Sequence, residues 1–289
     1  MNFEAFISDI VENQWNVHGV EVYDKGMLHT YGDTCKGRYP IYSATKTILS
    51  IAVGIAYDQG KIDLEKSILD YIPEKDLKAM SDVQRNTFKM ITLHRLMTMS
   101  VDDLPFRPEG ESYLDFSLAC KINEPETKVF NYSNISAYLV GVALTNAVQE
   151  DVCRYIDENI FEPMQIWSAE FCRCPDGYFY GASGMTLAVH DLSKIGLLLY
   201  NKGMYEGKRI VSEKYVDMAT SILQMNREGG YGYFIWKYRD GFSINGKWGQ
   251  KCYVLPEREL IITHLAHIEQ DSSDLLRSME KHILGLENR

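Results

Sequence analysis

Strand-type patterns occupy both ends of this sequence and are almost absent from its middle, and this order restricts the fold more than any other feature. Segments of alternating or β-rich residues are found at 17–23, 27–31, 231–238, 251–255 and 260–266. Between about 65 and 190, apolar residues follow helical spacing instead. One sheet can use all these strands only by combining the two ends of the chain. The sequence therefore predicts an α+β fold, in which an antiparallel sheet built from both termini is flanked by helices.

The helical middle is expected to form an inserted domain. Helices are predicted at 3–11, 44–59, 63–71, 91–99, 135–147, 151–160, 181–199 and 272–284. We expect residues 1–64 and 195–289 to form the sheet domain and residues 65–194 to form a mostly helical domain across it. A chain of 289 residues can bury such a core without disulfides or metal ions.

Composition and charge exclude several classes of function. Hydrophobic residues make up 45% of the chain and charged residues 24%, which is typical of a globular protein and not of a disordered or fibrous one. The net charge of −10 disfavours binding to nucleic acid or to an anionic membrane surface. No apolar run approaches the ~18 to 20 residues that span a bilayer. A small molecule is the expected partner, and the oligomeric state is left open.

The cysteines and the N-terminus favour a reduced, cytoplasmic protein. The six cysteines are scattered, and the only close pair, Cys172 and Cys174, has a shorter spacing than zinc sites use. We expect no metal site and no cofactor. The first ten residues contain acidic side chains and lack the basic region of a secretory signal.

The segment from Ser43 to Lys46 is the first candidate for catalysis. Residues three apart share a helix face, so the Lys46 amine can reach the Ser43 hydroxyl. At a helix start, Ser43 also has the positive end of the helix dipole and a free backbone N–H beside it. These are the requirements of an activated serine nucleophile with part of its oxyanion hole. The alternative is that Ser43 only caps the helix.

The context of the two matches to this spacing favours Ser43 as a nucleophile. The helix behind it, residues 47–56, is apolar on nearly every side and is therefore expected to be buried beside an interior cleft. A second match, from Ser278 to Lys281, lies in a charged amphipathic helix and has no such setting.

A second candidate group is formed by Tyr132, Ser133 and Asn134 at the start of another predicted helix. A lysine ammonium beside a phenol favours loss of the phenol proton, so Tyr132 could act as general base and later as acid. The Asn134 amide can orient both the lysine and the substrate. The alternative is a helix cap.

The combination of these motifs resembles the serine β-lactamase-like and penicillin-binding-protein-like superfamily, in its class C and esterase branch. Ser43-Ala-Thr-Lys46 and Tyr132-Ser-Asn134 carry the resemblance, which extends over about residues 17–268 and includes 91–100, 181–192 and 203–212. It implies the β-lactamase/transpeptidase-like fold, with the catalytic residues Ser43, Lys46, Tyr132 and Asn134.

The third motif of that superfamily, a Lys/His-Thr/Ser-Gly strand, is altered in this chain. Its nearest equivalent is Lys247-Trp248-Gly249-Gln250, with an indole in place of the hydroxyl that normally helps to hold a substrate carboxylate. The resemblance implies that these four residues bind substrate and that the Gln250 N–H completes the oxyanion hole. The alternative for Lys247 is an ordinary solvated turn lysine.

The sequence therefore predicts a serine hydrolase that forms an acyl-enzyme on a small ester, amide or β-lactam-like substrate. Lys46 and Tyr132 would together take the Ser43 proton, and Tyr132 would be the base for the attacking water. Two alternatives are open. One is a D-Ala-D-Ala peptidase or penicillin-binding protein, and the other is a penicillin-binding sensor that acylates without turnover.

Overall fold

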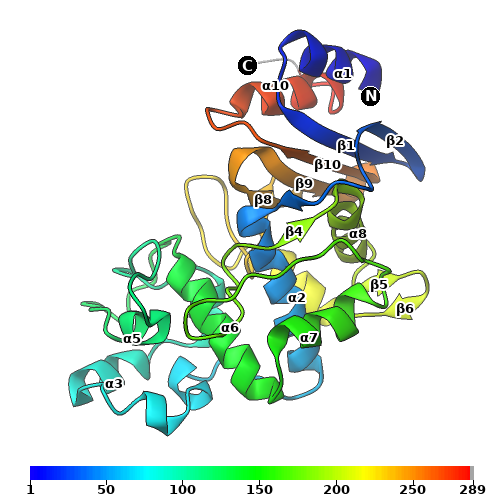
Figure 1. Ribbon diagram of the computed structural model, residues 1–289. Helices are drawn as coiled ribbons and strands as arrows, with labels where there is room; N and C mark the ends of the chain where they lie inside the picture. Colours follow the sequence, from blue (N-terminus) through cyan, green and yellow to red (C-terminus); the bar gives the residue numbers. More distant parts are fainter. Residues whose placement is uncertain (287–289) are drawn as a thin grey trace.

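One six-stranded antiparallel sheet joins the two ends of the chain, which confirms the predicted fold class (Figure 1). The computed structural model describes residues 1–286. The N-terminal strand β1 pairs along its length with the last strand, β10. In sheet order the strands are β2 (Met27–Gly32), β1 (Val17–Asp24), β10 (Leu260–Ala266), β9 (Gln250–Leu255), β8 (Gly241–Gly246) and β7 (Trp236–Tyr238).

Helices cover both faces of this sheet, so its central strands are buried on both sides. Every residue of β10 is buried. The terminal helices α1 (Phe3–Glu12) and α10 (Ser273–His282) pack on one face. Helix α8 (Val189–Tyr200) packs on the other, where Gly196 leaves room for Cys252 of β9, because a Cβ at this glycine would overlap the cysteine sulfur.

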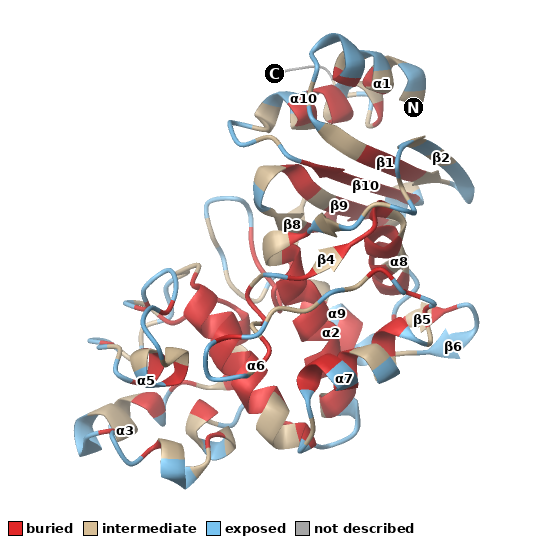
Figure 2. Ribbon diagram, in the orientation of Figure 1, coloured by how far each residue is buried: buried red, intermediate tan, exposed pale blue. Residues whose placement is uncertain are grey.

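A buried central helix connects the sheet with the helical part of the molecule (Figure 2). In α2 (Thr45–Asp58) every residue from Thr45 to Ala56 is buried. This helix packs against α6 (Asn134–Val148), α7 (Val152–Ile156) and α9 (Glu213–Thr220), and one hydrophobic cluster runs through all of them. The start of α2 therefore lies where the sheet and the helical part meet.

The remaining elements are short. The other helices are α3 (Asp82–Phe88), α4 (Leu93–Met97) and α5 (Tyr113–Leu118). Single turns are η1 (Tyr42–Ala44), η2 (Ile68–Tyr71), η3 (Glu74–Asp76), η4 (Asp157–Phe161), η5 (Lys247–Gly249) and η6 (Pro256–Arg258). Two small ladders pair β3 (Tyr39–Pro40) with β4 (Thr186–Leu187) and β5 (Met204–Tyr205) with β6 (Lys208–Arg209). None of the helices within residues 1–286 combines the length and apolar character that crossing a membrane requires.

Several element boundaries differ from the prediction. The helix expected at 181–199 begins only at Val189, and the strand expected at 231–238 is reduced to β7. Residues 231–235 are apolar and aromatic because they are buried in a loop, not because they are paired along a strand. The predicted division into 1–64 with 195–289 and 65–194 stays a prediction, and α8 spans its second boundary.

The packing of α2 on α9 generates a stability test at Gly54. A Cβ at this position would overlap the ring of Tyr215, which is buried and donates its hydroxyl hydrogen to Ser50 O at 2.8 Å. In an uncrowded helix, Gly54→Ala would stabilise the protein by about 1 kcal/mol. Here we expect it to destabilise by about 1 to 3 kcal/mol through overpacking, measured by urea unfolding. A stability gain would contradict this packing.

Candidate active site

Ser43 is presented by a strained turn at the entrance of the buried helix. It is the middle residue of η1, which leads directly into α2. The residue before it, Tyr42, has a φ of 47°, which is uncommon for a side chain other than glycine. Such strain persists only where the surrounding structure holds it, and it is frequent at active sites. Ser43 is half-buried, so its hydroxyl is both held in place and reachable.

The amine of Lys46 lies at the centre of the site and has three neighbours. Its Nζ is 3.2 Å from Ser43 Oγ, 2.7 Å from Asn134 Oδ1 and 2.7 Å from the carbonyl oxygen of Ala182. A neutral amine has two N–H donors and one lone pair. If the amide and carbonyl oxygens accept the two hydrogens, the lone pair is left for the Ser43 hydroxyl, which is the arrangement that a general base needs.

Burial makes that neutral form accessible near neutral pH. The Lys46 side chain is 1% exposed, and desolvation lowers its pKa to about 7. No carboxylate lies within salt-bridge distance of this amine among residues 1–286, so no ion pair opposes the desolvation.

Tyr132 and Asn134 reach the site from the start of α6. Ser133 caps this helix by accepting a hydrogen bond from Ile135 N, which places Asn134 in the first turn. The ring of Tyr132 lies 4.9 Å from Lys46 Nζ, and Tyr132 lines the same cleft as Ser43. The four residues predicted to be catalytic are therefore brought together.

The pKa of Tyr132 departs from the expectation that the lysine would make this phenol more acidic. Burial raises its pKa to about 12, and the influence of the nearby Ser43 hydroxyl offsets only part of this increase. Because the pKa of Lys46 is lowered to about 7, its amine is uncharged at the high pH at which this phenol titrates, and it then supplies no positive charge to stabilise phenolate. These pKa values favour Lys46 as the base of the resting site and Tyr132 as a proton donor.

Three aromatic side chains pack around the ring of Tyr132. Its ring stacks on Trp236 at a centroid distance of 5.5 Å and on Phe106 at 6.5 Å, and it meets the edge of Tyr231 at 6.3 Å. Tyr231 is fully buried and Trp236 is the first residue of β7. The sheet edge therefore contributes to the orientation of the phenol.

A cleft of about 390 Å³ opens in front of Ser43. This volume falls within the range of about 300 to 1,000 Å³ for small-molecule sites. The lining residues are Tyr42, Ser43, Phe106, Tyr132, Asn134, Ser183, Glu228, Trp236, Asn245, Gly246, Lys247 and Lys251.

Of the predicted third-motif residues, only Lys247 lines this cleft. Trp248 packs against Tyr42 and His267, at ring-centroid distances of 5.1 and 4.6 Å. Gly249 is buried, with φ at 90°, and Gln250 turns its side chain into the sheet, where it accepts from Ala266 N at 3.1 Å.

Asn245 and Gly246 line the cleft but are not among the predicted site residues, because the sequence does not predict strand β8. The segment Gly241–Gly246 is rich in glycine, serine and asparagine, which are typical of turns, and only its Phe242 and Ile244 show the alternation of a strand. A glycine is required at position 246, where β8 meets the chain just before η1, because a Cβ there would overlap the Ile41 carbonyl oxygen. Glu228 and Lys251 were also missed.

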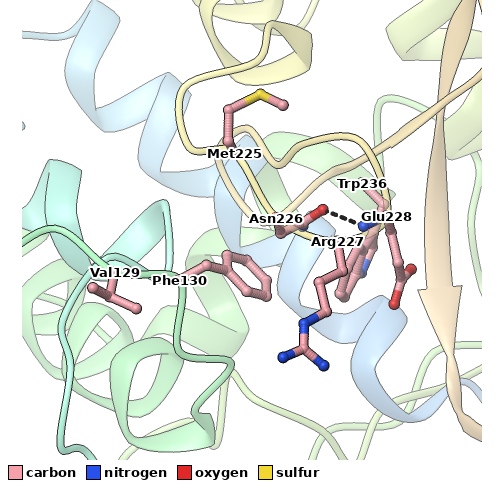
Figure 3. A pocket seen from close by; sticks show the side chains of 7 residues that line it. All are labelled: Val129, Phe130, Met225, Asn226, Arg227, Glu228 and Trp236. Carbon is pink, nitrogen blue, oxygen red and sulfur yellow. Dashed lines mark hydrogen bonds between the residues drawn. The ribbon is translucent and has the colours of Figure 1, made fainter.

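A second hollow, of about 590 Å³, adjoins the cleft and shares Glu228 and Trp236 with it (Figure 3). Phe130 and Trp236 supply aromatic surface, and Asn226 Oδ1 accepts a hydrogen bond from the Glu228 backbone N–H at 2.9 Å. The space available to a substrate thus extends beyond Ser43.

Within residues 1–286, one group of potential metal ligands is found, and it lies outside the cleft. Ligand atoms of Glu21, Cys35 and His190 are within 4.8 Å of one another, and His190 Nδ1 is 3.1 Å from Glu21 Oε1. None of the three lines the cavity in front of Ser43.

Comparisons with known proteins agree with this architecture. A sequence model of the family described as Beta-lactamase matches residues 16–283. The structure described as "Putative 6-aminohexanoate-dimer hydrolase from Bacillus anthracis" superposes with a TM-score of 0.78 at 19% identity, covering 97% of this chain and 83% of that one. A penicillin binding protein from Bacillus halodurans gives 0.74 at 15%, covering 95% and 99%. A beta-lactamase (Mb2281c) from Mycobacterium bovis gives 0.65 at 17%, covering 93% of each chain. No curated protein matches the sequence.

The geometry around Lys46 generates a direct titration test. With lysines labelled at 13Cε, we expect one resonance, absent in Lys46→Arg, to titrate near pH 7, because burial disfavours the ammonium form. A Lys46 resonance that titrates above pH 9.5 would contradict the neutral base.

Proposed function

The chain belongs to the Beta-lactamase family, and on this premise we propose that it is a serine hydrolase that acts through an acyl-enzyme on Ser43. The observation that carries the proposal is the buried Lys46 amine, which has oxygen acceptors for its two hydrogens and the Ser43 hydroxyl at 3.2 Å. Such an arrangement activates a serine and has no evident use in a protein that only binds.

In the first step, Ser43 Oγ attacks the substrate carbonyl and Lys46 takes the hydroxyl proton. The Lys46 ammonium then has three hydrogens, and its charge lies beside the Tyr132 ring. That new charge lowers the cost of forming phenolate, so Tyr132 gives its proton to the leaving group. The Lys46–Tyr132 cooperation predicted from the motifs is thus kept, with the two proton transfers in a defined order.

In the second step, Tyr132 phenolate takes a proton from water, and the resulting hydroxide attacks the acyl group. Lys46 returns its proton to Ser43 Oγ as the ester bond breaks, which restores the resting site. All protons balance over the cycle, and Tyr132 is the base for water.

The oxyanion of both steps needs two N–H donors. We assign one to the Ser43 backbone, at the start of the nucleophile helix. For the second we assign the Lys247 backbone rather than Gln250, because Lys247 lines the cleft and Gln250 does not.

The substrate class proposed is a small ester or amide. The volume of the cleft suits such a compound. One structural neighbour is described as a "Putative 6-aminohexanoate-dimer hydrolase", and amides are therefore the first compounds to assay.

Two serines with the same spacing to a lysine provide a matched test. Ser43→Ala should reduce hydrolysis of an uncharged p-nitrophenyl ester by about 10³-fold or more, because it removes the nucleophile. Ser278→Ala changes the serine of the Ser278–Lys281 pair, which bonds to Asp9 on the far side of the sheet, and should leave turnover intact.

Intact-mass measurement during the same assay separates the alternatives. Steady product release with a transient acyl adduct on the parent protein supports a hydrolase. A stable adduct without release would support a sensor instead. Equal turnover by the parent and by Ser43→Ala would refute the assignment of the nucleophile.

A further inference from the structure

Two side chains of opposite charge line the catalytic cleft without pairing to each other. Lys251 and Glu228 both face the cavity in front of Ser43. Within residues 1–286, neither side chain makes a salt bridge or a hydrogen bond. Lys251 is half-buried, and a partly desolvated amine without a partner is costly unless a ligand supplies one, whereas the Glu228 carboxylate is exposed to solvent.

Lys251 is held inside the cleft by the sheet. It lies on β9, directly across from Asn245 of β8, and is half-buried. The Asn245 side-chain oxygen is also buried and has no partner among the described residues. Burial lowers the pKa of Lys251 to about 8, with Glu228 opposing this effect, so the amine is still mainly charged at pH 7.

Glu228 is an exposed residue of the loop that borders the cleft and the second hollow, and Figure 3 shows its backbone hydrogen bond to Asn226. Asn226 Oδ1 accepts hydrogen bonds from Glu228 N at 2.9 Å and from Gly230 N at 3.0 Å, which fixes the turn that carries the carboxylate. Glu228 also borders the second hollow, beside Trp236.

Two other charged side chains, Lys247 and Arg227, lie near the cleft but are exposed. Lys247 is exposed, and its Nζ lies 4.2 Å over the Trp248 ring. Arg227 is exposed and lines only the second hollow. Among the described residues that line the cleft, Lys251 is therefore the half-buried cation, and Glu228, although exposed, is the one carboxylate that a ligand bound at Ser43 would meet.

We propose that the cleft selects esters or amides that carry both a carboxylate and an ammonium group, with the carboxylate at Lys251 and the ammonium at Glu228. Derivatives of amino acids and short peptides have this chemistry. The inference rests on the proposed function, because it places the scissile carbonyl at Ser43.

Four chromogenic esters test the proposal. Their acyl group is 4-ethylbenzoyl or 4-(aminomethyl)benzoyl, and their leaving group is 4-nitrophenol or 4-hydroxy-3-nitrobenzoate, so that the set is neutral, cationic, anionic and doubly charged. A second set exchanges the positions of the two charges. For each ester, kcat/KM of a variant is divided by kcat/KM of the parent, which cancels the intrinsic reactivity of the ester.

In at least one set, Lys251→Met should lower this ratio about tenfold more for esters with a carboxylate than for those without. Glu228→Gln should do the same for esters with an ammonium group. The matched controls are Lys237→Met and Glu257→Gln, which change the same charges outside the cleft and should show no such selectivity.

The outcomes separate the two proposals. If the neutral ester is hydrolysed through Ser43 but both cleft variants affect all the esters equally, charge recognition is refuted and the hydrolase stands. If no ester is turned over, the proposed function fails, and the substrate class fails with it.

Discussion

The desolvated amine of Lys46 is the interaction on which the rest of the site depends. It is buried because α2 passes through the middle of the molecule. Asn134 from α6 and the Ala182 carbonyl oxygen accept hydrogen bonds from it. Removing water lowers the pKa of the amine, and in the mechanism that we propose its two oxygen acceptors leave the lone pair of the neutral form for Ser43. Burial of a lysine usually destabilises a protein, and we propose that here it provides the catalytic base.

Much of the fold could be predicted because the hydrophobic pattern records which face of an element is buried. The strands at both ends and the long helices behind Ser43 and Asn134 follow from period alone. The short elements could not be predicted in this way. Strand β8 consists largely of turn-forming residues, and the aromatic segment 231–235 resembles a strand while forming a buried loop. In both places, tertiary contacts override local preference.

The candidate site likewise contains some contacts that local sequence predicts and others that depend on long-range packing. Ser43 and Lys46 are three residues apart, so local helix geometry predicts their contact. The meeting of Tyr132 and Asn134 with them follows from the motif combination. The pKa of Tyr132 depends on how deeply the phenol is buried, and Glu228, Asn245 and Lys251 reach the cleft through strand pairing and loop packing. Such long-range placement leaves no local signal in one sequence.

The central claim is that neutral Lys46 activates Ser43, and the pH dependence of kcat/KM for an uncharged ester tests it most directly. Because the deprotonated amine is the active form, kcat/KM should rise with pH through an apparent pKa near 7 and then level off. Tyr132, with its pKa raised to about 12, adds no step below pH 9. A rate that is constant from pH 5 to 9, or that falls as pH rises through 7, would contradict the account.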